Sequence, residues 1–222
     1  MIVFPVVHIM NYSQAERQAN IALSSGADGV FFIHHGILGD ALTLRLAKDF
    51  KALHPSKTIG VNLLSMDAAE AVKSAFEAGI NDIWVDHAGV HSEKGEPALL
   101  QFLAGMAKAH NLNIHAGVAF KYQRHEPMPD AAVKMAMEHN LIPVTSGSGT
   151  GVAADVDKIA TMAKAANGNL GVASGLTVEN IEQYRPHINY AFVATGVSVN
   201  DYEFDEEKLR QFIEAAHKQA VA

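Results

Sequence analysis

Short apolar runs alternate with longer amphipathic stretches along the whole chain, eight times over. The runs are rich in β-branched and aromatic residues and are apolar throughout, which predicts strands of a parallel sheet that is covered on both faces. The amphipathic stretches between the runs predict helices. The expected strands are residues 2–9, 29–34, 58–63, 82–86, 113–120, 142–145, 171–173 and 190–194. The expected helices are residues 13–25, 40–53, 67–79, 97–110, 130–140, 155–166, 178–184 and 205–217.

Eight strand–helix units within 222 residues predict a closed (β/α)8 TIM barrel of the α/β class. An open, doubly wound sheet is the alternative, because it has the same alternation of elements. No Pro-, Gly- or Ser-rich linker and no shift in composition divides the chain, so we expect one domain over residues 1–222. In a barrel, functional residues gather on the loops that follow the strands.

Glycine and hydroxyl residues follow the last three expected strands, in the runs 146–151, 174–177 and 195–198. Because glycine lets the backbone approach a ligand closely, several N–H groups can point at one anion in such turns. The first amides of the helix that begins near Thr177 could point at the same anion. A tight strand-to-helix connection is the alternative reading of each turn alone. The expected phosphate-binding residues are Ser146, Gly147, Gly149, Ser174, Gly175, Thr195 and Gly196.

Titratable and amide side chains stand at the ends of the other strands. We expect His8, Asn62, Asp86 and Lys121 at the reacting end of a ligand, together with His34 or its neighbour His35. Histidine and carboxylate pairs suit acid–base work, and a lysine in a pocket can hold an anion or act as a base. The alternatives are a hydrogen-bonded structural histidine and a lysine whose ammonium group reaches solvent.

Two connections are longer than the rest, residues 87–97 and 121–129. Both are polar and contain histidine, and the second contains Pro127 and Pro129. We expect these loops to form a lid or to face the substrate.

Composition narrows the class of partner. The net charge of −7 argues against a nucleic acid or an anionic membrane, so we expect a small phosphorylated ligand held by local groups. Cysteine is absent, no secretory signal or membrane span is evident, and a cytoplasmic location is expected. With no cysteine and no ordered metal-ligand spacing, we expect no metal. No dinucleotide fingerprint is complete, so we expect no cofactor. The oligomeric state stays open, a homo-oligomer included.

The chain resembles the BtpA family of barrel proteins, which is named for a photosystem I biogenesis factor. The matching runs are 26–29, 60–64 with Asp67, 79–83, 146–151, 172–180, 192–198 and 204–212. The runs after strands seven and eight are shared with phosphoribosylanthranilate isomerase and other phosphate-binding barrels. The chain departs from the family pattern at Ile33-His34-His35, where an acid and an amide are usual, and at Gly117 and Ala119 before Lys121. The resemblance implies the fold and the face that carries the site.

Two functions are therefore weighed from the sequence. The first is an enzyme that acts on a small phosphorylated metabolite by proton transfer, as an isomerase or a lyase. The second is a non-catalytic accessory protein that stabilises or assembles a larger complex. An exposed apolar patch on the helical shell would favour the accessory protein, and a closed polar pocket would favour the enzyme.

Overall fold

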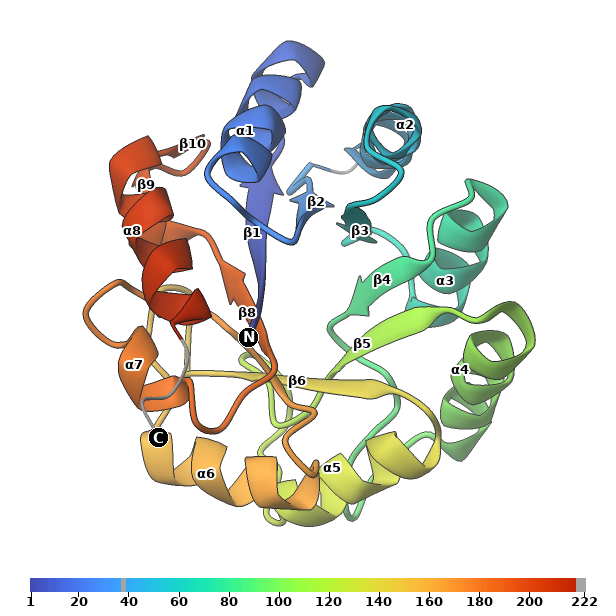
Figure 1. Cartoon of the computed structure of the whole chain (residues 1–222). Coiled ribbons are helices and arrows are strands. Elements are labelled where there is room, and N and C mark those ends of the chain that lie inside the picture. The colour runs from blue at the N-terminus through green and yellow to red at the C-terminus, as the bar shows by residue number, and fades with distance from the viewer. Residues whose placement is uncertain (37–38, 219–222) are drawn as a thin grey trace.

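The computed structural model describes residues 1–36 and 39–218 of the chain, and Figure 1 shows helices surrounding a ring of strands. The strands of the ring are β1 (Ile2–His8), β2 (Gly29–Ile33), β3 (Thr58–Asn62), β4 (Asp82–Val85), β5 (Asn113–Gly117), β6 (Ile142–Ser146), β7 (Gly171–Ala173) and β8 (Tyr190–Val193). The helices are α1 (Tyr12–Ser24), α2 (Gly39–Leu53), α3 (Ala68–Glu77), α4 (Pro97–His110), α5 (Pro129–Glu138), α6 (Val156–Ala165), α7 (Ile181–Tyr184) and α8 (Glu206–His217).

The sheet closes on itself. Each strand pairs in parallel with the next, and β1 also pairs in parallel with β8, where Ile2 lies opposite Tyr190 and Phe4 opposite Phe192. The predicted (β/α)8 barrel is therefore confirmed, and the open sheet is excluded. Because all eight strands run in one direction, their carboxyl ends meet at one mouth of the barrel.

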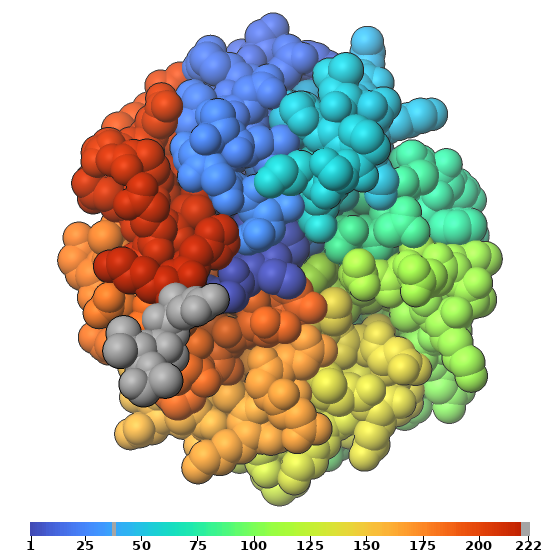
Figure 2. All heavy atoms as spheres, in the orientation of Figure 1, coloured from blue at the N-terminus to red at the C-terminus, as the bar shows by residue number. Residues whose placement is uncertain are grey.

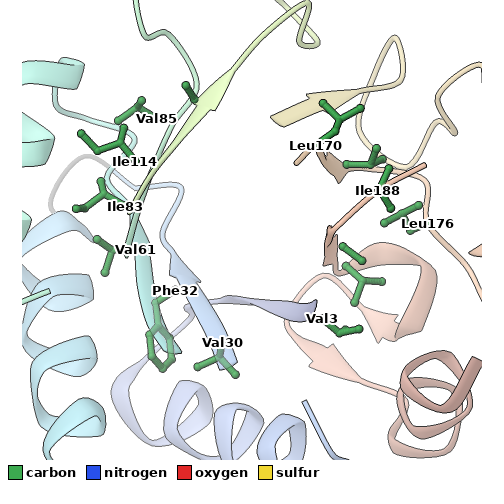
Figure 3. Packing of buried hydrophobic residues seen from close by; sticks show 14 of the residues in the cluster. Val3, Val30, Phe32, Val61, Ile83, Val85, Ile114, Leu170, Leu176 and Ile188 are labelled. Carbon is green, nitrogen blue, oxygen red and sulfur yellow. The ribbon is translucent and has the colours of Figure 1, made fainter. Parts of the chain in front are cut away.

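Alternate strand residues serve two different cores, because successive side chains of a strand point to opposite faces of the sheet. One set packs against the helices, and Figure 3 shows Phe32, Val61 and Ile83 pointing outward from their strands. The other set fills the barrel, including the buried rings of Phe4 and Phe192. In the space-filling view of Figure 2 atoms close over the centre of the molecule. The barrel interior is thus a packed core that supports the mouth.

Three local features differ from the sequence prediction. Strand β5 ends at Gly117 instead of residue 120, because the backbone turns sharply at Ala119, whose φ is 48°. Helix α7 has only four residues and begins at Ile181. A 3-10 turn, η1 (Thr195–Val197), and a small antiparallel hairpin of β9 (Ser198–Asn200) and β10 (Glu203–Phe204) follow β8. The hairpin was not expected, and it lies on the side of the mouth where the site is.

Candidate functional site

The inward positions at the strand ends bring His8, Asn62 and Asp86 to the mouth. In β1, Phe4 and Val6 belong to the barrel interior, so His8 is the next inward residue. In β4, Trp84 is interior, so Asp86 is the next inward residue after the strand. Asn62 ends β3, is 3% exposed, and its Nδ2 donates to Asp86 Oδ1 at 3.1 Å. The mouth therefore has a histidine on one side and a linked amide–carboxylate pair on the other.

The two adjacent histidines after β2 point to different places. His34 Nδ1 accepts from the backbone N–H of Gly36 at 2.7 Å, and its ring lies against Gly39 at the start of α2. The ring of His35 lies 5.0 Å from that of His8 and lines a cavity in the mouth. Since Ile33 is interior, the next inward position is 35. Of the two candidates, the structure brings His35 into the site and leaves His34 behind the strand.

A small cavity of about 90 Å³ lies beneath the turns after β7 and β8. Ser174, Gly175, Thr195 and Gly196, four of the expected phosphate-binding residues, line it. Within the described residues, the backbone N–H groups of Gly175 and Leu176 have no hydrogen-bond acceptor, and both residues line this cavity. Unpaired N–H groups at a cavity that also holds hydroxyl side chains are suited to an anion. The cavity is called the anion cavity below.

Lys121 supplies the positive charge of the anion cavity. Its Nζ donates to Ser174 Oγ at 2.9 Å and to Thr150 Oγ1 at 3.2 Å, and all three residues line the cavity. Burial lowers the pKa of Lys121, and the nearby carboxylate of Asp86 opposes that shift. An arriving phosphate can replace the two hydroxyl partners with a full opposite charge. Thr150 and Gly151 also line the cavity; both belong to the run 146–151, but they are not among the seven phosphate-binding residues expected from the sequence.

The glycines of the two turns have a different role from the one we expected. A Cβ atom at Gly175 would collide with the backbone of Val152 and Ala153, and one at Gly196 would collide with the carbonyl of Leu176. These glycines therefore let the loops after β6, β7 and β8 pack backbone to backbone. Their side-chain positions do not face the space an anion would take. The amide of Thr177 is also occupied, because it donates to Asn180 Oδ1 at 2.8 Å.

Only some residues of the loop after β6 lie at the anion cavity. Ser146 is fully buried, and its Oγ accepts from the backbone N–H of Lys121 at 2.7 Å, which fixes the backbone of that lysine. Gly147 lines a separate, larger cavity of about 720 Å³ beside the mouth. Gly149 does not belong to the lining of the anion cavity described above. The structure thus separates Gly147 and Gly149 from the turns after β7 and β8.

Burial sets the protonation of the groups around the mouth. Burial and, to a smaller extent, the neighbouring His35 lower the pKa of His8 to about 4, against the opposing charge of Asp201. Burial also lowers the pKa of His35. Burial raises the pKa of Asp86, against the hydrogen bond from Asn62 and the charge of Lys121. Near neutral pH the two imidazoles are therefore uncharged and able to accept a proton.

A second cavity of about 210 Å³ opens beside the anion cavity. The hairpin β9–β10 and the turn Asp201–Tyr202 form its outer wall, and His8, Thr150 and Thr195 line both cavities. Sequence reasoning missed this wall, since residues 198–204 are too few and too mixed in polarity to show a long alternating pattern. The two cavities together form an elongated site with His8 between its ends.

The two long loops, which we expected to form a lid or to face the substrate, are fastened to each other. The buried carboxylate of Glu126 accepts from the backbone N–H of Ser92 at 2.8 Å, from the Ser92 hydroxyl, and from the N–H of Met128 at 2.8 Å. His91 Nε2 also contacts the carbonyl of His125 at 3.1 Å. The loops 87–97 and 121–129 therefore form one connected rim.

Across residues 1–36 and 39–218, no three histidine, aspartate or glutamate side chains are grouped as a metal site requires. None of the helices in those same ranges is both long and apolar enough to cross a bilayer.

Solved structures share this fold over nearly their whole length. A 3-hexulose-6-phosphate synthase has a TM-score of 0.73 and 15% identity, over 97% of this chain and 99% of that one. A 3-keto-L-gulonate-6-phosphate decarboxylase from Vibrio cholerae has a TM-score of 0.70 and 15% identity, over 97% and 96%. A phosphoribosylanthranilate isomerase from Thermotoga maritima has a TM-score of 0.66 and 15% identity, over 99% and 100%. No family model and no curated protein sequence matches the chain.

Proposed function

We propose that this protein is a phosphate-binding barrel enzyme that acts on a small phosphorylated metabolite by proton transfer, as an isomerase or a lyase. The observation that carries the proposal is the anion cavity, where the Lys121 ammonium, two hydroxyls and two unpaired backbone N–H groups meet. The names of the three structural neighbours each specify a phosphorylated compound or a phosphoribosyl group, which supports this ligand class. On the motifs quoted above, we also propose a BtpA-type barrel.

The proposed mechanism starts from the phosphate, which Lys121 and the turns after β7 and β8 hold in place. The rest of the ligand then extends past His8 and His35. A neutral imidazole there removes a proton from a carbon next to a carbonyl group. The Asn62–Asp86 pair faces the same space, and its carboxyl group hydrogen-bonds the ligand or returns the proton. Fixing the phosphate converts this step into one between groups already in position.

The distribution of exposed apolar side chains favours the enzyme over the accessory protein. Seven of the ten large exposed ones in the described residues stand on loops or the hairpin around the mouth: Met10, Leu64, Tyr122, Met128, Val152, Val199 and Tyr202. The remaining three, Leu53, Phe76 and Phe102, are on three different helices of the shell. Apolar surface around the anion cavity supports ligand binding at the mouth.

The first test is ligand-induced stabilisation. A panel of sugar phosphates is screened by thermal unfolding, and a true ligand at ~100 times its dissociation constant should stabilise the fold by about 2–3 kcal/mol. The matched dephosphorylated sugars serve as controls and should give no shift. If no phosphorylated compound stabilises the protein beyond its dephosphorylated partner, the phosphate-site proposal is wrong.

The second test separates the enzyme from the accessory protein. Stabilising ligands are incubated with the protein in D2O, and NMR follows the exchange of carbon-bound hydrogen next to the carbonyl group. We expect exchange with the wild type and at least a ~100-fold slower rate when the proposed bases are removed together, in His8→Asn/His35→Asn. Tight phosphate binding without any exchange would support the non-catalytic alternative. The cytoplasmic location and the lack of a nucleic-acid partner stay predictions, and the oligomeric state stays open.

A further inference from the structure

The hairpin β9–β10 places a carboxylate at the far end of the elongated site. The cavity that it walls has His8, Thr150 and Thr195 in common with the anion cavity, so one ligand can occupy both. Asp201 stands at the hairpin turn and lines this second cavity. Its charge reaches the site, because it raises the pKa of both His8 and His35 against the effect of burial.

The hairpin is held rigidly against helix α1. Gln14 is 2% exposed, and its Nε2 donates to the carbonyls of Tyr202 at 2.5 Å and His8 at 3.2 Å. Gln18 Oε1 accepts from the backbone N–H of Phe204 at 2.8 Å, and Arg17 pairs with Glu203 at 2.6 Å. The turn itself is closed by Asn200, whose Oδ1 accepts from the N–H of Tyr202 at 2.9 Å. These bonds fix the backbone of the hairpin turn that carries Asp201 before any ligand arrives.

The second cavity offers hydrogen-bond acceptors and no lasting positive charge. In the described part of the chain its lining contains no lysine or arginine, and His8 is neutral near pH 7 because burial lowers its pKa to about 4. Ser198 Oγ donates to the carbonyl of Ala194 at 2.9 Å, which leaves its oxygen free to accept. Asp201 adds a carboxylate, which accepts hydrogen bonds and repels anions. The two ends of the site thus have opposite preferences for charge.

From this arrangement we infer that Asp201 determines specificity: the ligand carries one phosphate, and the end remote from it bears hydroxyl or ammonium groups and no second anion. This inference rests on the proposed phosphate site, and it adds what lies at the other end. A bisphosphate or a compound with a remote carboxylate meets the Asp201 charge and is disfavoured, whereas a terminal hydroxyl or ammonium donates to it.

Two compounds with the same carbon chain test the inference. Sorbitol 6-phosphate and 6-phosphogluconate differ at the end remote from the phosphate, where one has a hydroxymethyl group and the other a carboxylate. Calorimetry at pH 7.5 should show that the wild type binds sorbitol 6-phosphate at least ~10-fold more tightly, which is the effect of one unfavourable charge pair of about 1.4 kcal/mol. The variant Asp201→Asn should reduce the ratio to ~3-fold or less, and Asp201→Lys should reverse it.

The matched control is Glu77→Lys, which makes the same charge change at an exposed residue at the end of α3. It should keep the wild-type ratio. Inorganic phosphate is measured on every variant and should bind with affinities within ~3-fold for the wild type and Asp201→Asn. If inorganic phosphate binds but the wild type does not discriminate between the two compounds, the role of Asp201 is wrong and the phosphate site stands. If inorganic phosphate does not bind to the wild type, the proposed function fails, and this inference fails with it.

Discussion

Two half-buried lysines, Lys121 and Lys158, should give opposite results when each is replaced by methionine. Burial lowers the pKa of both Lys121 and Lys158. Lys121 Nζ donates to the hydroxyls of Ser174 and Thr150 in the anion cavity. Lys158 Nζ donates to backbone carbonyls, those of Ala119 at 2.8 Å and Ser146 at 3.0 Å. Methionine keeps most of the apolar stem in each case and removes the charge and its hydrogen bonds.

The magnitudes follow from the partners that are left behind. Lys121→Met leaves two hydroxyls that can turn to water, so the unfolding free energy should change by no more than about 0.5 kcal/mol. The same variant loses a charged hydrogen bond to phosphate of ~1.5–3 kcal/mol, which should weaken ligand binding roughly 10- to 150-fold. Lys158→Met leaves two carbonyls at the ends of neighbouring strands without their donor, which should cost about 1–3 kcal/mol of stability. At this chain length each 1 kcal/mol lowers the Tm by roughly 2–4 °C.

Calorimetric unfolding and titration with the best-stabilising sugar phosphate measure both effects on the same samples. The expected pattern is reciprocal: Lys121→Met loses affinity and keeps its Tm, and Lys158→Met loses Tm and keeps most of its affinity. The assignment of Lys121 to the ligand is refuted if Lys121→Met lowers the Tm as much as Lys158→Met while ligand affinity is unchanged. Lys121 would then hold the loops together in the way that Lys158 does.

Three further predictions concern strain, burial and proton balance. Ser174 has a φ of 78°, so Ser174→Gly should relieve backbone strain and raise the unfolding free energy by about 1 kcal/mol. The variant should also weaken phosphate binding, because it removes a hydroxyl from the anion cavity. A loss of stability in chemical denaturation would contradict this prediction. His115 is fully buried among aromatic rings with neither ring nitrogen hydrogen-bonded, and burial lowers its pKa below 6.5. Because His115→Phe removes two buried nitrogens without partners, it should raise the unfolding free energy by about 1–3 kcal/mol near neutral pH. Below about pH 6.5 the unfolded chain binds a proton at His115 that the folded chain does not, so the variant should also lose less stability on acidification than the wild type. Since Lys121 must be protonated to hold phosphate and burial lowers its pKa, the exchange rate should fall on the alkaline side at a lower pH than an exposed lysine would give. Lys121→Arg should move that fall to higher pH, and an unmoved alkaline limb would assign it to another group.

The barrel could be predicted from the sequence because its evidence is local and repeated. Each apolar run is a strand in the structure, and the amphipathic stretches are helices whose bounds differ by a few residues. The sequence also shows a reason for the start of α3: Asp67 stands just before an apolar period, and it accepts from the N–H of Glu70 at 2.9 Å. The strand ends then placed His8, Asn62 and Asp86 at the mouth.

The details of the site depend on contacts between distant segments, which no local pattern contains. Which of His34 and His35 faces the mouth depends on where β2 ends relative to the alternation of its inward and outward side chains, and the sequence does not show that end. The glycines at 147 and 175 look alike in sequence, but only the packing of three loops decides which of them borders the anion cavity. The hairpin β9–β10 is held by Gln14 and Gln18, whose bonds to it span 188 and 186 residues.

The bond between Glu126 and Ser92 has a consequence for the kinetics of binding. It ties two loops from different strands into one body, so neither can swing aside alone without exposing a buried carboxylate that has lost its donors. Ligand entry then does not wait for a lid to open. Association should follow a single phase whose rate rises linearly with ligand concentration, and ionic strength should slow it, because the charge of Lys121 attracts the phosphate across an open mouth. With the rim held in place, diffusion sets the rate of ligand entry.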